Sequence, residues 1–206
     1  MNPDKKLHII GCGGHARSVA DVYLSLDSVH AIVFLDENAR KGEKIFGYDV
    51  LKLSYSNQNT GVDYFVALGD NEKREELFKK YESNGHIVSI LSNSAYISEF
   101  AKLGKGVFIG NFTHVGPEVE IGDNTIINTA SIIEHGVKIG AHSHIAPNVA
   151  ISGNTVIGKR NFVGVGASIK DCVNICDNVI IGAGAVVITD IYEAGTYVGV
   201  PAKRIK

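Results

Sequence analysis

The 206-residue chain has no tryptophan, one methionine, four prolines and three cysteines. The odd number of cysteines and the lack of a Cys-x-x-Cys spacing disfavour a disulfide framework and a zinc knuckle, so we expect three reduced thiols. An excess of charge of one sign is also missing, because 20 Lys and Arg residues stand against 22 Asp and Glu residues, for a net charge of −2. Without a basic field, the chain is not expected to bind nucleic acid.

Long apolar segments are absent as well. No run of about 18 apolar residues could span a bilayer, and the segment Met1–Lys6 lacks the apolar core of a signal peptide. We therefore expect a cytoplasmic protein without membrane insertion. Apolar residues nonetheless make up 45% of the chain and charged residues 20%, which is typical of a globular protein.

Residues 1–92 alternate apolar runs with helical patterns, and we expect them to form one domain. The order of strand, crossover and strand predicts an α/β domain with a small parallel, Rossmann-like sheet. The expected elements are, in chain order, a strand at 7–10, a glycine-rich turn at 11–16, a helix at 16–26, strands at 31–35 and 64–68, a helix at 72–83 and a strand at 87–91.

Residues 93–206, the expected second domain, follow a different pattern. Every sixth residue from Leu91 to Val187 is aliphatic, at seventeen of seventeen positions. Glycine recurs one residue after many of these positions, and small or β-branched residues recur four residues after them. A period of six without a helical pattern predicts short strands joined by tight turns and stacked in a parallel β-solenoid.

Two groups of residues are suited to chemistry. The turn Gly11-x-Gly13-x-x-Ala16 follows a strand and opens a helix, so its backbone N–H groups can hold phosphate. Asp36 ends the next strand, at a spacing that suits a ribose or base contact. The middle of the solenoid contains four histidines, a residue type that can act as a general base near neutral pH. They are His114, His135, His142 and His144.

The hexads resemble the hexapeptide repeat of left-handed parallel β-helix acyltransferases, in which three hexads form one coil, so the resemblance implies between five and six coils. The segment 128–147, which contains His135 and His144, is similar to the catalytic coil of bacterial nucleotide-sugar acetyltransferases of the NeuD/PglD type. This resemblance extends over the whole chain. The other segments that match the pattern of this family are 9–16, 34–36, 67–71 and 198–204.

The resemblance implies an acetyl-CoA-dependent N-acetyltransferase that acts on the amino group of a nucleotide-linked 4-amino sugar, with UDP as the expected nucleotide. Transfer would be direct, with His135 as the general base and Asn128 as a further catalytic residue in the same coil. No metal is expected. Because the family forms trimers with active sites between neighbouring solenoids, we expect a homotrimer. The expected contacts are His144, Gly153, Val165 and Ala183 for acetyl-CoA, and Gly13, Gly14, His15, Asp36 and Asn71 for the nucleotide sugar.

One position departs from the family pattern. An acidic residue usually follows the catalytic histidine and orients its ring, whereas this chain has Gly136 there. Glu118 lies 18 residues before Gly136, one coil beneath it, and we expect its carboxylate to orient His135 instead. Glu134 is nearer in sequence, but side chains alternate between the two sides of a strand, so it is expected to point away.

Three alternatives stay open. The first is acetyl transfer to a hydroxyl of sialic acid or of another sugar. The second is a zinc-dependent hydratase of the solenoid carbonic anhydrase type, with His114, His135 and either His142 or His144 as metal ligands. The third is a non-catalytic scaffold that binds a nucleotide sugar, an alternative that Gly136 supports.

Overall fold

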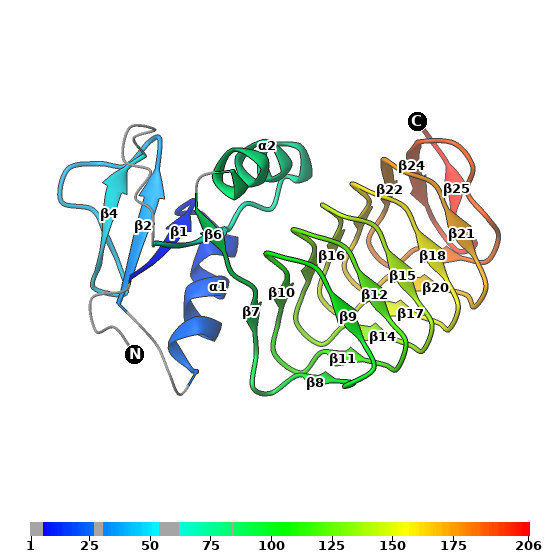
Figure 1. The fold of residues 1–206 in the computed structure, drawn as a ribbon. Helices are drawn as coiled ribbons and strands as arrows, with labels where there is room; N and C mark the ends of the chain where they lie inside the picture. The colour runs from blue at the N-terminus through cyan, green and yellow to red at the C-terminus, as the bar shows by residue number, and fades with distance from the viewer. Residues whose placement is uncertain (1–5, 27–30, 54–61, 84) are drawn as a thin grey trace. The chain divides into compact units, whose positions relative to one another are not determined.

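The computed structural model describes residues 6–26, 31–53, 62–83 and 85–206 (Figure 1). The chain forms two compact units, Met1–Ile90 and Leu91–Lys206, which we call the N-terminal and C-terminal units. Sequence patterning places the domain boundary after residue 92, close to this division. Among the residues described, the structure contains no helix with the length and apolar character needed to cross a bilayer.

The N-terminal unit is a six-stranded sheet with the strand order β3-β4-β2-β1-β5-β6. All its pairs are parallel except that of β3 with β4. The predicted α/β fold with a small parallel sheet is therefore confirmed. The elements are β1 (Leu7–Ile10), α1 (Gly14–Leu24), β2 (Ile32–Asp36), β3 (Lys44–Ile45), β4 (Tyr48–Lys52), β5 (Asp63–Val66), α2 (Asn71–Glu82) and β6 (His86–Ile87).

Two features of this unit differ from the sequence-based expectation. The hairpin of β3 and β4 is not predicted, because its turn contains a phenylalanine in place of the usual Asn-Gly or Gly-Gly pair. Phe46 and Gly47 have φ values of 53° and 84°, as a two-residue hairpin turn requires. The strand expected at 87–91 is also divided, since β6 ends at Ile87 and residues 90–91 form the first strand of the solenoid.

Helix α2 packs against β5 in this unit. Its residues Phe78 and Tyr81 are each 3% exposed and belong to a buried cluster with Ile10, Tyr64 and Val66. The chain leaves β5 at Val66 and enters α2 at residue 71, so a short turn brings the start of the helix to the end of the strand. The Asp70 side chain caps the helix by accepting from the N–H of residue 73 at 2.9 Å.

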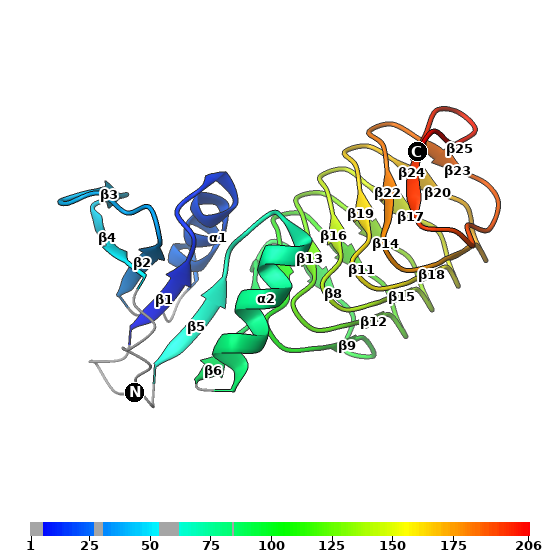
Figure 2. The same cartoon turned by 90° about the horizontal axis from the view of Figure 1, so that it is seen from above.

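The C-terminal unit is a parallel β-solenoid whose strands lie on three faces, and Figure 2 shows its coils stacked one behind another. We name the faces after one strand each: the β16 face (β25-β24-β22-β19-β16-β13-β10-β7), the β14 face (β23-β20-β17-β14-β11-β8) and the β15 face (β21-β18-β15-β12-β9). Strands pair 18 residues apart, as in Val115 with Ile133 and Ile121 with Ile139. The predicted solenoid is confirmed.

Nearly all of these strands are two residues long. Their bounds are β7 (Ile90–Leu91), β8 (Tyr96–Ile97), β9 (Lys102–Leu103), β10 (Phe108–Ile109), β11 (His114–Val115), β12 (Glu120–Ile121), β13 (Ile126–Ile127), β14 (Ile132–Ile133), β15 (Lys138–Ile139), β16 (His144–Ile145), β17 (Ala150–Ile151), β18 (Val156–Ile157), β19 (Phe162–Val163), β20 (Ser168–Ile169), β21 (Asn174–Ile175), β22 (Val179–Ile181), β23 (Val186–Val187), β24 (Gly195–Val198) and β25 (Lys203–Arg204).

The interior of the solenoid holds the aliphatic ladder that the period of six predicts. Ile133 and Ile145, for example, are fully buried. The small polar residues of the interior satisfy their hydroxyl groups on the next coil, as Ser131 Oγ donates to the carbonyl of Ala146 at 3.0 Å. Four more interior hydroxyl groups donate in the same way to a carbonyl 15 residues further on, those of Thr113, Thr125, Ser143 and Thr155.

Two of the edges where faces meet position the candidate site. We call the line of turns between the β14 and β15 faces the β14–β15 edge; it contains residues 117–118, 135–136, 153–154 and 171–172. The line between the β16 and β14 faces is the β16–β14 edge, with residues 128–130, 146–148, 164–166 and 182–184. Each turn includes a residue with left-handed backbone, such as Ala130 with φ 57° and Gly136 with φ 67°.

Candidate active site

His135 lies on the β14–β15 edge with its side chain exposed. Its carbonyl accepts from the N–H of Asn154 at 2.9 Å, and the next residue, Gly136, donates to the carbonyl of Pro117 at 3.0 Å. These bonds tie the turn to the coils on either side. The imidazole packs on Gly153, where a β-carbon would lie 2.5 Å from its Cε1 atom. The fold therefore brings together two of the predicted site residues, His135 and Gly153.

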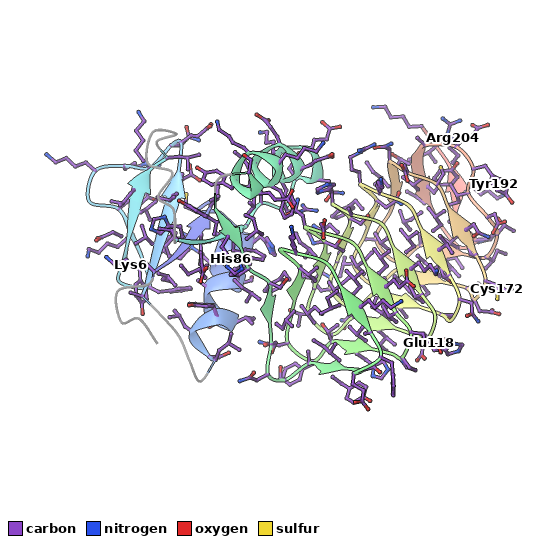
Figure 3. The ribbon with its side chains drawn as sticks, in the orientation of Figure 1. Lys6, His86, Glu118, Cys172, Tyr192 and Arg204 are labelled. Atoms are coloured by element: carbon purple, nitrogen blue, oxygen red, sulfur yellow. The ribbon has the colours of Figure 1, made fainter. Side chains whose placement is uncertain are left out.

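Glu118 lies on the same edge, one coil before Gly136, as the 18-residue spacing predicts. The side chain is exposed at the surface of the solenoid (Figure 3). It lines a groove of about 440 Å³ together with Gly136, Asn154 and Phe100. Among the residues that the structure describes, no hydrogen bond or ion pair joins Glu118 to His135, so its orienting role stays a prediction.

His144 projects outward from the β16 face and is 9% exposed. Its Nε2 atom lies 3.4 Å from the amide nitrogen of Asn128, and its ring makes an edge contact with Phe162, with ring centroids 5.2 Å apart. The amide oxygen of Asn128 accepts from the N–H of Thr129 at 2.8 Å, which turns the amide nitrogen toward the histidine. The predicted residues Asn128 and His144 are thus direct neighbours.

The two histidines lie on opposite sides of the solenoid. His135 is on the β14–β15 edge, and the β16 face that carries His144 is the side of the triangle that this edge does not touch. Their separation of nine residues is half of the 18-residue coil. One chain therefore cannot present both imidazole rings to the same cleft.

The remaining predicted acetyl-CoA contacts follow the second edge. Val165, which is 50% exposed, and Ala183 stack along the β16–β14 edge, where the N–H of Gly184 donates to the carbonyl of Val165 at 2.9 Å. Asn128 begins the same edge two coils earlier. The predicted site of one chain is therefore divided between two edges, with the β14 face between them.

The other two histidines of the solenoid have partners of their own. His114 projects from the β14 face and stacks on Tyr96, with ring centroids 5.2 Å apart. His142 is buried at the turn after β15, with Nδ1 2.9 Å from the amide nitrogen of Asn124. The four histidines do not converge within one chain. Throughout the described ranges, no three His, Cys, Asp or Glu side chains form a group able to hold a metal.

The glycine-rich turn of the N-terminal unit leads from β1 into α1. Gly11 has a φ of 109°, and a β-carbon there would lie 3.0 Å from the carbonyl oxygen of Ala67, so this position requires glycine. Gly13 is the N-cap of α1, and a β-carbon at Gly13 or Gly14 would meet open space. With His15 in the first turn, the helix presents accessible N–H groups of the kind that bind anions.

Asp36 connects this turn to the end of β2. Its Oδ2 atom accepts from the N–H of Cys12 at 3.1 Å, and its Oδ1 atom accepts from the N–H of Asn38 at 2.8 Å. Burial and the Asp36 carboxylate raise the pKa of the Cys12 thiol to about 11. Arg17, which sequence reasoning missed, donates from Nη1 to the carbonyl of Cys12 at 2.6 Å. Arg17 adds a cation to the glycine-rich turn. Its position in the first turns of the predicted helix is the feature by which sequence analysis could have identified it.

A pocket of about 330 Å³ opens at the carboxyl ends of β1 and β2. Gly11 and Asp36 line it from the sheet, and Lys73 and Glu76 line it from α2. Asp36 is the one predicted nucleotide-sugar contact in this lining. Sequence reasoning missed the α2 residues, because a polar helix face is distinctive only after the helix is placed beside the sheet.

Asn71 begins α2 and is held by Arg74. The guanidinium donates from Nη2 to Oδ1 of Asn71 at 2.7 Å and from Nη1 to the carbonyl of Leu68 at 3.0 Å. Arg74 is 1% exposed, and its burial lowers the pKa of the guanidinium to about 10. This residue was also missed, because an arginine in a charged amphipathic helix usually faces solvent.

Comparison with protein families matches residues 6–81 to the PglD N-terminal domain and residues 100–130 to the bacterial transferase hexapeptide repeat. A curated protein of Acanthamoeba polyphaga mimivirus, which is uncharacterised, is 31% identical over 125 residues. That match covers 59% of this chain and 24% of the viral protein, so the chain spans about a quarter of the length of this relative.

Solved structures match over nearly the whole chain. The acetyltransferase domain of PglB from Neisseria gonorrhoeae is 30% identical, with a TM-score of 0.91 over 98% of this chain and 100% of that one. The same domain has been solved with acetyl coenzyme A. A mutant of perosamine N-acetyltransferase from Caulobacter crescentus, solved with CoA and GDP-perosamine, is 31% identical, with a TM-score of 0.92 over 98% of both chains. The chain therefore belongs to the PglD-type family of hexapeptide-repeat sugar N-acetyltransferases.

Proposed function

We propose that this protein transfers an acetyl group from acetyl-CoA to the amino group of a nucleotide-linked 4-amino sugar. The observation that carries the proposal is the likeness, over 98% of both chains, to an enzyme solved with CoA and GDP-perosamine. Both units of the chain take part in that likeness. UDP is the nucleotide implied by the family resemblance, and GDP is the nucleotide of the perosamine relative, so both are candidates.

His135 acts as the general base in this proposal. The sugar amine attacks the thioester carbonyl carbon, and the imidazole accepts a proton from the amine nitrogen as the C–N bond forms. The tetrahedral intermediate then collapses, the C–S bond breaks and CoA leaves as a thiolate. Because amine and thioester are held side by side, no acyl-enzyme is needed. The exposed position of His135, next to the Gly136 that lines a groove, supports this role.

The N-terminal unit binds the nucleotide part. The start of α1, with Gly13, Gly14 and His15, holds the diphosphate through backbone N–H groups. The pocket beside Asp36 takes the nucleoside, and its volume of about 330 Å³ is at the lower end of the range for small-molecule sites. Asn71 flanks this region with an amide that Arg74 holds in place.

The active unit of the protein is a homotrimer. Its support is the division of site residues between opposite sides of one chain, since His135 of one copy and His144 of another can share a cleft. The β14 face is suited to the contact, because Tyr96 and Ile132 project from it with 61% and 44% exposure. The β15 face carries charges instead, with Glu120 placed 3.6 Å from the ammonium group of Lys138.

The test is release of the CoA thiol from acetyl-CoA in the presence of UDP-, GDP- and dTDP-linked 4-amino sugars. We expect release with at least one of them and loss of release in His135→Ala. The matching sugars with a hydroxyl in place of the amine serve as controls, and release with these alone would replace N-acetylation by O-acetylation. If no acceptor releases CoA, the proposal fails and the scaffold alternative takes its place.

A further inference from the structure

The backbone conformation at position 153 does not explain why this residue is glycine. Its φ lies outside the left-handed region, so the conformation suits any residue. The equivalent positions of the other coils on the β14–β15 edge are occupied by Pro117, His135 and Asp171, which shows that this turn accepts side chains. The backbone of this turn therefore gives no reason for glycine, and the group nearest to a side chain at this position belongs to a neighbouring residue.

The neighbour is the imidazole of His135, one coil before. A β-carbon at Gly153 would lie 2.5 Å from Cε1, 2.6 Å from Nε2 and 3.1 Å from Nδ1 of that ring. These distances are well inside the separation at which carbon atoms make favourable contact, about 3.5 to 4.0 Å. The ring thus occupies the volume that any side chain at position 153 would need.

A second glycine of the same edge, Gly136, borders a side chain of the next coil, whereas Gly153 borders one of the previous coil. Gly136 has a φ of 67°, yet the equivalent residues Glu118, Asn154 and Cys172 adopt φ values of 61°, 56° and 58° with full side chains. The left-handed turn therefore does not by itself demand glycine. A β-carbon at Gly136 would lie 2.5 Å from Oδ1 of Asn154, so the side chain of the next coil fills the space beside it.

The two contacts interlock the neighbouring turns. The side chain of His135 lies on Gly153, and the side chain of Asn154 lies against Gly136. The backbone bond from the N–H of Asn154 to the carbonyl of His135, at 2.9 Å, joins the same two turns. Each glycine is thus paired with the side chain that crosses it from the facing coil.

We propose that Gly153 is a positioning residue for His135, because its missing β-carbon forms the seat on which the imidazole rests, and that Asn154 completes this arrangement by filling the space beside Gly136. The inference deepens the proposed function and rests on it for the role of His135 as a base. It gives a reason for glycine at position 153 that does not depend on the predicted acetyl-CoA contact there. Asn154 also lies where a side chain at position 136 would begin, so an acidic residue there would have to displace the Asn154 amide.

The decisive variant is Gly153→Ala, with Asp171→Ala as the matched control at the same turn position one coil later. The ring is observed directly by NMR of protein labelled in its histidine rings, with the His135 signal assigned from His135→Ala. We expect Gly153→Ala to shift that signal and Asp171→Ala to leave it in place. An unmoved His135 signal in Gly153→Ala overturns the inference, whether or not the protein is an active acetyltransferase.

Enzyme kinetics distinguish a role of Gly153 in positioning the His135 ring from a role in binding acetyl-CoA. A misplacement of about 1 Å at a reacting group lowers turnover by up to about 100-fold, so we expect Gly153→Ala to lower kcat by roughly 10- to 100-fold with KM for acetyl-CoA within about twofold. A raised KM for acetyl-CoA with unchanged kcat would identify Gly153 as a ligand contact and refute the seat.

The Gly136 contact has its own test. Gly136→Glu places a glutamate in a turn conformation that Glu118 already adopts, so its obstacle is the Asn154 side chain. We expect Gly136→Glu to lower the melting temperature and the double variant Gly136→Glu/Asn154→Gly to recover most of the loss. Equal melting temperatures for the two variants would show that Asn154 does not fill this space. If none of the tested acceptors causes the wild-type protein to release CoA, the proposed function fails. The NMR and melting measurements still show whether the His135 ring rests on Gly153 and whether Asn154 fills the space beside Gly136.

Discussion

The amide nitrogen of Asn128 lies 3.4 Å from Nε2 of His144, one coil further along the solenoid. Because the amide oxygen is engaged by the N–H of Thr129, the amide acts as a donor toward the imidazole. In its neutral form with the proton on Nδ1, the His144 ring can accept this hydrogen bond at Nε2. We therefore predict that Asn128 orients the His144 ring, and acetyl-CoA binding tests this role.

Asn128→Ala should weaken acetyl-CoA binding more than it slows the chemical step. One hydrogen bond contributes about 0.5 to 1.5 kcal/mol, so we expect KM for acetyl-CoA to rise about 3- to 10-fold. The measurement is steady-state kinetics with saturating nucleotide sugar. An unchanged KM would show that the orientation of His144 does not affect the cosubstrate.

The two glutamates near His135 should differ in their effect on turnover. Glu118 lies one coil before Gly136 on the β14–β15 edge, whereas Glu134 lies directly before His135. If the Glu118 carboxylate favours the productive tautomer of the ring, Glu118→Gln lowers kcat by roughly tenfold and Glu134→Gln leaves it near the wild-type value. Near-native rates in both variants would remove Glu118 from the site.

Assembly should depend on the β14 face and not on the β15 face. Ile132 and Val156 are exposed aliphatic residues of similar exposure, 44% and 38%, on these two faces. A buried carboxylate at an apolar contact is costly, so Ile132→Asp should sediment as a monomer and lose acetyltransferase activity. Val156→Asp should remain a trimer. If both variants keep the same sedimentation coefficient as wild type, the β14 face is not the contact.

Removal of the buried arginine should destabilise the N-terminal unit. Arg74 satisfies the carbonyls of Leu68 and Gly69, and in Arg74→Ala these acceptors lose their donor. We expect a loss of about 2 to 3 kcal/mol in urea unfolding, together with weaker nucleotide-sugar binding. Lys79→Ala, which removes an exposed ion pair with Glu75 on the same helix, should cost less than about 0.5 kcal/mol. Equal losses would contradict the structural role of Arg74.

The Cys12 thiol should react slowly below strongly alkaline pH. Its pKa is raised to about 11 by burial and by the Asp36 carboxylate, and the thiolate is the reactive form. At pH 8 the exposed Cys172 should therefore be alkylated first, and the rate at Cys12 should climb until the pH reaches about 11. Asp36→Asn removes one cause and should increase the rate at Cys12. Mass spectrometry of iodoacetamide-treated protein measures both sites, and equal rates at pH 8 would contradict the shift.

The solenoid was predictable because its repeat assigns an environment to each position. Strands pair 18 residues apart, which is three repeats of six. The aliphatic residue at every sixth position therefore faces the interior, as the fully buried Ile133 and Ile145 confirm. The same spacing places Glu118 beneath Gly136. The resemblance to acetyltransferases, carried by the segments around His135 and the glycine-rich turn, is likewise confirmed by the family and structure matches.

The N-terminal unit was less predictable, because its packing combines elements that are distant in sequence. The β3–β4 hairpin turns at Phe46, a residue that seldom signals such a turn. The pocket lining from α2 depends on how that helix lies against the sheet, and Arg74 is buried although its neighbours in sequence are charged. The sequence pattern around each of these features is the same as that of an ordinary surface helix or loop, so the pattern does not reveal them.

By itself, the sequence determined an α/β sheet followed by a solenoid and the placement of His135 and His144 half a coil apart, because a strict period of six allows the aliphatic column to be buried in one way. The tertiary structure alone decided that the His135 ring rests on Gly153, that Asn154 fills the space beside Gly136, and that Arg74 turns inward. These arrangements depend on the direction of side chains across neighbouring coils and elements, which spacing along the chain does not encode.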